Sequence, residues 1–175
     1  MMKLLFSLQS QEARMSNKTP TENIKISIQE SDFSIEKENH FLSNQAPEIG
    51  AVVTFTGRVR EFSEQPDVTG LFLEHYPGMT EKSLKRIIEQ AQQRWDIQRI
   101  SVIHRIGSLA VEDQIVFVGV SSAHREAAFE AARYIMDYLK TEAPFWKKEI
   151  TRSGEHWVEA REKDQAARAR WGNPD

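Results

Sequence analysis

Two long stretches with helical periodicity constrain the fold more than any other feature of the chain. Apolar side chains recur every three or four positions in residues 80–95, with Thr80 as a candidate N-cap. Residues 123–140 show the same period, with Ser121 or Ser122 as a candidate N-cap. The pattern predicts that the second helix turns these side chains inward: Ala128, Phe129, Ala132, Ile135, Met136 and Leu139. Each helix must bury its apolar face against another element.

Short segments rich in β-branched and aromatic residues supply that surface. They predict strands over residues 24–28, 51–56, 71–76, 100–106 and 114–120. A short helix over 34–43, a hairpin of 145–151 with 156–160 and a terminal helix over 161–171 complete the expected elements. Strands and helices do not alternate strictly, and neighbouring strands have short links. The chain is therefore expected to form a two-layer α+β domain with a mixed or antiparallel sheet and two long helices.

The length and the polar start of the chain suggest one domain with an extension. Residues 1–22 are polar and are expected to be a flexible N-terminal extension, within which Met15 is an alternative start, and residues 23–175 are expected to be a single domain. No apolar run approaches the ~20 residues needed to span a bilayer, so no membrane association is expected. The chain has no cysteine, which excludes disulfides and thiolate metal sites and fits a cytoplasmic location.

Two kinds of ligand are made less plausible by charge and histidine spacing. The formal net charge is −3, which argues against general nucleic-acid binding and requires any anion site to be a local cluster. The five histidines have no i,i+4 pair, so no metal site is expected.

Cationic residues gather in two places before the end of the second long helix. Arg58 and Arg60 follow a predicted strand, and His124 and Arg125 stand at the start of a helix, where free N–H groups favour an anion. Both clusters are also compatible with ordinary exposed surface.

The third cluster lies around Pro144, where Lys140 precedes the proline and Lys147 and Lys148 follow it. Such a cluster could grip an anionic ligand, or it could be a solvated helix end whose cations face the negative end of the helix dipole. Nucleophilic or general-base chemistry by a lysine would need burial or neighbouring cations to lower its pKa. Phe145 and Trp146 are expected in the core, with a ligand contact as the alternative.

Seven segments, in the same order along residues 24–171, closely resemble the large, catalytic subunit of molybdopterin synthase. They are AVVTFTGRVR (51–60), LEHYPGMTEK (73–82), VIHRIG (102–107), SAHR (122–125), IMDYLK (135–140), APFWKKE (143–149) and WVEAR (157–161). The resemblance implies an α/β-hammerhead-like fold and a sulfurtransferase of molybdenum cofactor biosynthesis. Sulfur would pass from the C-terminal thiocarboxylate of a small ubiquitin-like carrier subunit to cyclic pyranopterin monophosphate, giving the dithiolene of molybdopterin. No cofactor is implied, and the subunit would form a homodimer within a heterotetramer.

The resemblance also implies which residues form the site. Lys140 corresponds to the essential lysine and Lys147 to a second important one, while Lys140 could act as nucleophile, proton carrier or electrostatic stabiliser. The binding positions would be Arg58, Val59, Arg60, His124, Arg125, Lys148 and Glu149, with Arg161 as a weaker candidate for the anion pocket.

The helix length then raises a question about the site. His124 and Lys140 are 16 residues apart, which corresponds to about 24 Å along a helix. No pocket for a small pterin spans that distance, so either the helix breaks or two copies of the chain share each site. Because no Pro or Gly lies between the two residues, we expect a shared site.

One alternative function belongs to a different class. A non-catalytic module could bind an acidic peptide tail through the same Lys and Arg clusters. Replacing Lys140 would then weaken partner binding, whereas in an enzyme it would remove turnover and leave partner binding largely intact.

Overall fold

A mixed four-stranded sheet forms the centre of the structure. The computed structural model describes residues 23–61, 67–158 and 162–172. The central sheet has the order β1-β4-β6-β2, in which β1 runs parallel to β4 and the other neighbours are antiparallel. Its strands are β1 (Ile24–Gln29), β4 (Arg99–Arg105), β6 (Gln114–Ser122) and β2 (Ala51–Arg58).

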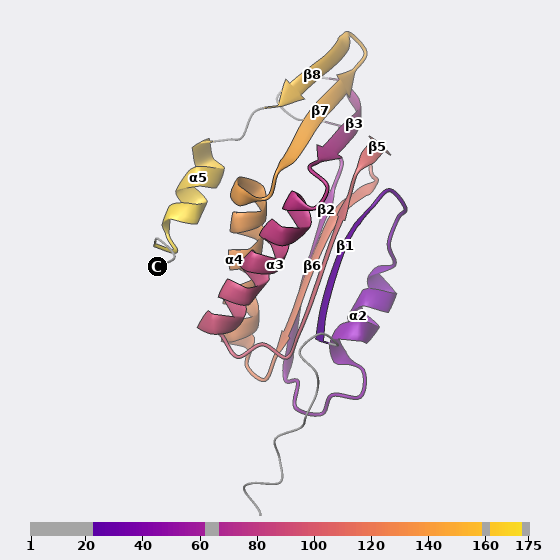
Figure 1. Cartoon of the computed structure of the whole chain (residues 1–175). Helices are drawn as coiled ribbons and strands as arrows, with labels where there is room; N and C mark the ends of the chain where they lie inside the picture. Colours follow the sequence, from indigo (N-terminus) through magenta and orange to yellow (C-terminus); the bar gives the residue numbers. More distant parts are fainter. Residues whose placement is uncertain (1–22, 62–66, 159–161, 173–175) are drawn as a thin grey trace, which may run out of the picture.

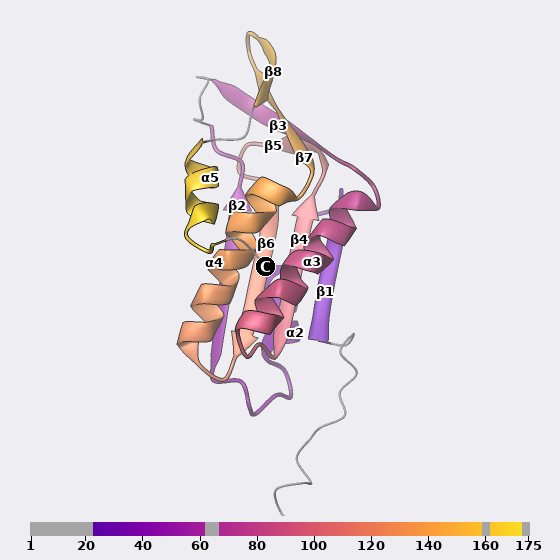
Figure 2. The same ribbon diagram turned by 60° about the vertical axis from the view of Figure 1, so that its left-hand side comes forward.

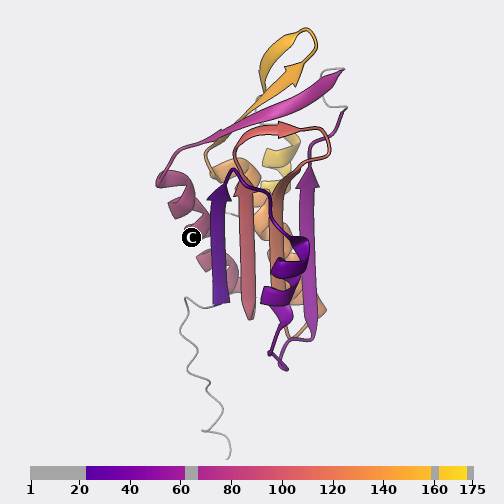
Figure 3. The same cartoon turned by 90° about the vertical axis from the view of Figure 1, so that its right-hand side faces the viewer.

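Helices cover both faces of this sheet (Figure 1). The helices α3 (Met79–Arg94) and α4 (Arg125–Glu142) pack side by side on one face and enclose the main core. The shorter α2 (Ile35–Ser43) covers the opposite face, as Figure 3 shows, and buries Leu42 against Phe117. Gly119 permits this close approach, because a Cβ there would lie 2.4 Å from Leu42 Cδ1.

A second sheet lies across one end of the first (Figure 2). It is antiparallel, with the order β5-β3-β7-β8. Its strands are β5 (Gly107–Ala110), β3 (Val68–His75), β7 (Phe145–Thr151) and β8 (Gly154–Val158). Because β7 follows α4 directly, the second sheet brings the residues after Pro144 next to the end of α4.

The C-terminal helix α5 (Glu162–Ala169) is held beside α4. Trp171 packs edge-on against Trp95 and Tyr134, and its Nε1 donates to Asp137 Oδ2 at 2.8 Å. Arg168 forms an ion pair with Glu142 on α4. Aromatic packing and polar contacts therefore both fix this helix.

The α+β class, the mixed sheet and the two long helices are confirmed. The separation into two sheets was not predicted, and β5 lies in a stretch expected to be only a connection between two strands. The N-caps predicted for the two long helices were wrong: Ser121 and Ser122 belong to β6 and His124 precedes α4, while Gly78 precedes α3.

The predicted inward face of α4 was wrong at one position. Ala128, Ile135 and Leu139 are buried, but Phe129 is 61% exposed. The expected flexible extension over 1–22 lies outside the described residues. In the described part of the chain, no helix is long and apolar enough to cross a membrane, and no His, Asp and Glu residues cluster as a metal site.

Candidate active site

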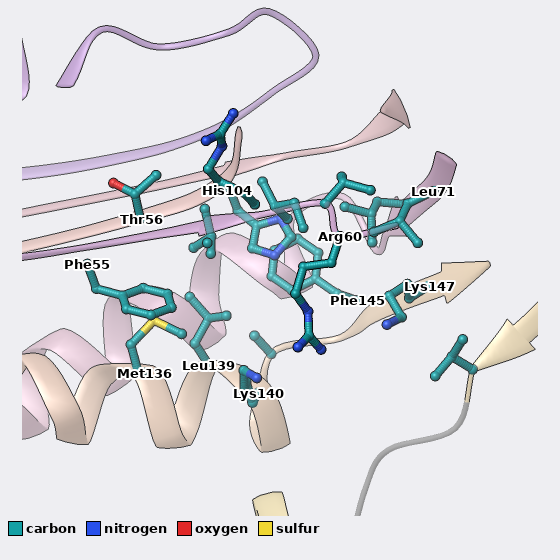
Figure 4. Close-up of a pocket in the computed structure, with 18 of the residues that line it drawn as sticks. Phe55, Thr56, Arg60, Leu71, His104, Met136, Leu139, Lys140, Phe145 and Lys147 are labelled. Carbon is teal, nitrogen blue, oxygen red and sulfur yellow. The ribbon is translucent and has the colours of Figure 1, made fainter. Parts of the chain in front are cut away.

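A cavity of about 730 Å³ lies where the two sheets meet the C-terminal end of α4 (Figure 4). Its wall includes four cationic side chains from three elements and the segment after β2: Arg58, Arg60, Lys140 and Lys147. Glu149 is the one carboxylate among the described lining residues. The structure thus brings together cations from two of the clusters seen in the sequence, and the cavity that they line has an excess of positive charge.

One stripe of α4 forms a wall of the cavity. Met136, Leu139, Lys140 and Ala143 line it, a spacing of three, four and seven residues that places them on one side of a helix. Lys140 is exposed in the last turn, where the helix dipole favours a cation. Among the described residues its ammonium has no ion-pair partner, so it is available to an anionic ligand.

The alternation of β7 separates two lysines that are adjacent in sequence. Lys147 and Glu149 point into the cavity, where Lys147 Nζ lies 3.3 Å from Glu149 Oε1. Lys148 points to the other face of the sheet and pairs with Glu155 at 2.7 Å. There its ammonium also lies 5.3 Å from the ring of Trp157. The structure therefore places Lys147, and not Lys148, with Lys140.

The end of β2 presents its two arginines to the same cavity. A register irregularity between Gly57 and Arg58 ends the regular pairing with β6. Val59 is buried, and its backbone exchanges hydrogen bonds with Glu112 and Asp113. Arg58 and Arg60 are exposed on either side of it, and Arg58 Nε donates to the Glu112 carbonyl at 2.8 Å. The buried valine thus anchors a segment whose flanking guanidinium groups reach the ligand space.

His124 and Arg125 lie at the opposite end of α4 from Lys140. The helix is continuous from Arg125 to Glu142, so the possibility that it breaks is excluded. Both residues are exposed and neither lines the cavity. Arg161 lies outside the described residues.

A buried threonine ties the start of α3 to the turn between α4 and β7. Thr80 is fully buried, and its hydroxyl accepts from the Tyr76 amide at 3.1 Å and lies 3.1 Å from the Pro144 carbonyl oxygen. Next to this turn, Phe145 is half-buried in the cavity wall, whereas Trp146 is 50% exposed. The expectation of a core position was therefore wrong for Trp146.

His104 lines the cavity and was missed in the sequence, where it looked like part of an apolar strand. It is buried, and its ring stacks on that of Phe145 with the centroids 3.7 Å apart. Burial, together with the nearby charge of His75, lowers the pKa of His104 to about 4 against an opposing hydrogen bond to the Arg105 backbone. One feature of the sequence could have identified His104 as an inward-facing residue. It lies on the same face of the strand as Ile100 and Val102, which pack in the core under α3 and α4.

Comparison with known proteins identifies the family to which this fold belongs. The MoaE protein family model matches residues 28–142, and the chain belongs to this family. A relative from Vibrio cholerae serotype O1 is 56% identical over 147 residues, which cover 84% of this chain and 97% of the relative. That relative is named molybdopterin synthase catalytic subunit.

Solved structures agree with this assignment. A molybdopterin biosynthesis MoaE protein from Burkholderia ambifaria is 48% identical, with a TM-score of 0.74, and the match covers 86% of this chain and 99% of that one. A molybdopterin synthase from Staphylococcus aureus is 36% identical, with a TM-score of 0.70 and coverage of 75% and 95%. A Helicobacter pylori complex of subunits 1 and 2 of molybdopterin-converting factor shares the fold at 18% identity, with a TM-score of 0.64 and coverage of 79% and 91%.

Proposed function

We propose that this chain is a catalytic subunit that transfers sulfur from the C-terminal thiocarboxylate of a small ubiquitin-like carrier to cyclic pyranopterin monophosphate. The product is the dithiolene of molybdopterin. The observation that carries the proposal is the cavity in which Arg58, Arg60, Lys140 and Lys147 converge, in a member of the MoaE family. Both reactants are anions, and a partly enclosed cationic cavity offsets their mutual repulsion.

The positions of the cations suggest a division of labour. Arg58 and Arg60 come from one side of the cavity and are suited to the substrate phosphate, because guanidinium groups bind such oxygens in a bidentate manner. Lys140 and Lys147 come from the end of α4 and from β7, and they stabilise the charge of the thiocarboxylate and of the transition state. Glu149 holds Lys147 in place through their ion pair. Lys148 remains a proposed binding position, on the opposite face of the sheet, where it pairs with Glu155.

The second half of the site is proposed to come from another copy of the chain. The helix α4 is continuous, so His124 stands about 24 Å from Lys140, and Arg125 is one residue nearer. A twofold axis that set two copies of α4 antiparallel would bring the His124 end of one beside the Lys140 end of the other.

Exposed apolar side chains support such a homodimer. Val52 and Phe55 on the edge strand β2 are 37% and 43% exposed, and Phe129 on the adjoining α4 is 61% exposed. An edge strand with neighbouring exposed apolar groups is suited to association. With two carriers, the dimer would form the centre of a heterotetramer.

Reconstitution tests the activity. The chain is mixed with thiocarboxylated carrier and cyclic pyranopterin monophosphate, and dithiolene is measured. Lys140→Ala is expected to lower turnover by about 100-fold or more while carrier affinity stays within about threefold. The control Lys85→Ala changes an exposed lysine on α3 that pairs with Glu89, and it should leave both turnover and carrier affinity unchanged. Absence of product with the folded wild-type chain would overturn the proposal. If Lys140→Ala instead weakens carrier binding in proportion to the lost charge, the non-catalytic module is favoured.

Residues 1–22 are taken to be an extension that the reaction does not need, and a chain that starts at residue 23 tests this by its turnover. The reaction is assigned to the cytoplasm, which cell fractionation tests.

A further inference from the structure

His104 is the buried polar side chain of the cavity that the proposed sulfur transfer has not used. It lies near the end of β4, is 6% exposed, and lines the same cavity as Lys140 and Lys147. Figure 4 shows its ring lying against that of Phe145, beside the Arg60 side chain. The two rings are inclined by 17°, so Phe145 fixes the plane of the imidazole.

The hydrogen bond of His104 defines its tautomer. Nδ1 lies 2.8 Å from the carbonyl oxygen of Arg105. A carbonyl oxygen can only accept, so Nδ1 carries the proton. In the neutral ring Nε2 then holds a lone pair and acts as an acceptor. Nε2 makes no hydrogen bond to any residue in the described ranges, and it belongs to a ring in the cavity wall.

Among the described lining residues, the side chains that can accept a hydrogen bond are Glu149, His104 and the Thr56 hydroxyl. Arg58, Arg60, Lys140 and Lys147 offer only N–H donors. The carboxylate of Glu149 is already engaged by Lys147. Such donors suit the phosphate of the substrate, but they cannot pair with the N–H groups of its reduced pterin ring. A ligand with an anionic end and an N–H-bearing ring therefore needs an acceptor away from the cations.

We propose that His104 Nε2 is the acceptor that binds an N–H of the pterin ring, so that His104 positions the heterocycle while the arginines hold the phosphate. This inference rests on the proposed function and adds to it a residue that distinguishes pterin from other phosphorylated ligands. The low pKa agrees with this role, because a ring with a pKa of about 4 stays neutral at neutral pH and keeps its lone pair. A protonated ring would repel the cations and would have no lone pair to offer.

Two substitutions separate the two nitrogens of the ring. His104→Asn keeps an amide donor near the position of Nδ1 and leaves nothing at the position of Nε2. His104→Gln places an amide oxygen near the position of Nε2. With cyclic pyranopterin monophosphate, His104→Asn is expected to bind about tenfold more weakly than wild type, and His104→Gln is expected to recover part of that loss. Affinities are measured by calorimetry without the carrier.

Inorganic phosphate serves as a second probe, because it engages the cations alone. Phosphate affinity should be unchanged in both His104 variants. Arg60→Ala should weaken the binding of both phosphate and cyclic pyranopterin monophosphate. Equal substrate affinity in wild type and His104→Asn would overturn the role of His104. A parallel loss of phosphate binding in His104→Asn and His104→Gln would overturn it too, since the histidine would then only hold the cavity in shape. Failure of wild type to bind either ligand would instead count against the proposed function.

Discussion

At the scale of single residues, the ion pair between Lys147 and Glu149 couples stability to the site. Glu149 is fully buried and Lys147 is partly exposed at the cavity. Lys147→Ala should remove a cation from the site and leave a buried carboxylate without that partner. We expect a loss of about 2 kcal/mol in the free energy of unfolding, below the usual cost of breaking a fully buried pair, together with a large loss of turnover.

The double variant separates these two effects. Adding Glu149→Gln removes the buried charge, so it should restore about half of the lost stability and none of the turnover. Urea unfolding and the dithiolene assay measure the two quantities on the same samples. If turnover returns along with stability, Lys147 acts only through the fold.

A second prediction at this scale concerns pH. The pKa of His104 is lowered to about 4 from an ordinary value of 6.5, mainly by burial and also by His75. Between these values the unfolded chain takes up a proton that the folded chain does not, so stability is complete above pH 6.5 and falls as the pH drops toward 4. The contribution is about 2 kcal/mol between pH 7.5 and pH 5.

Unfolding of wild type and His104→Gln at both pH values measures this term. The free energy of unfolding of wild type, relative to that of His104→Gln, should fall by that amount between pH 7.5 and pH 5, because the variant lacks the titrating group. His156→Gln, an exposed position on β8, is the control and should keep the wild-type dependence. An unchanged difference would show that His104 does not carry the linkage.

Residue identity predicted several of the cations that line the cavity and missed His104 for a physical reason. Arg58, Arg60, Lys140 and Lys147 could be singled out because clustered cations stand out in a chain of net charge −3. Lys148 has the same chemistry, yet strand alternation turns it to the other face. His104 is hidden in an apolar strand, and its place in the cavity wall arises only when two sheets and a helix meet.

At the scale of elements, periodicity located helices and strands but not their partners. The buried residues of α3 follow the predicted stripe, because one apolar face must meet the sheet. The short strand β5 has only four residues and no distinct pattern, so its pairing with β3 could not be foreseen. Phe129 looks like a core residue by its type, but it lies on a face of α4 that nothing in the described part of the chain covers.

The docking of α5 gives a prediction at this scale. Trp171 packs on Trp95 and Tyr134 and donates to Asp137. Trp171→Ala should lower the free energy of unfolding by about 2–3 kcal/mol, less than for a fully buried tryptophan because Trp171 is half-buried. Urea unfolding measures the change. The control Trp146→Ala removes a side chain that is 50% exposed and should cost below about 1 kcal/mol. Equal costs would mean that the aromatic cluster does not hold α5 in place.

At the scale of the whole molecule, the proposed homodimer makes a quantitative prediction about mixed subunits. Lys140→Ala and His124→Ala should each be inactive as pure proteins. After complete exchange of an equal mixture, half of the dimers contain one copy of each variant. If the sites are shared, each such dimer has one site with both residues intact and one with neither. The mixture should therefore regain about a quarter of the wild-type activity.

The matched control mixes Lys140→Ala with Lys147→Ala, two residues that line the same cavity of one chain. Exchange then leaves every site without one of the two lysines, so no activity should return. Native mass spectrometry of size-tagged subunits verifies that exchange has taken place in both mixtures. Recovery in the first mixture and not in the second assigns His124 and Lys140 to different protomers of one site. If neither mixture regains activity although mixed dimers are present, His124 does not act in the same site as Lys140.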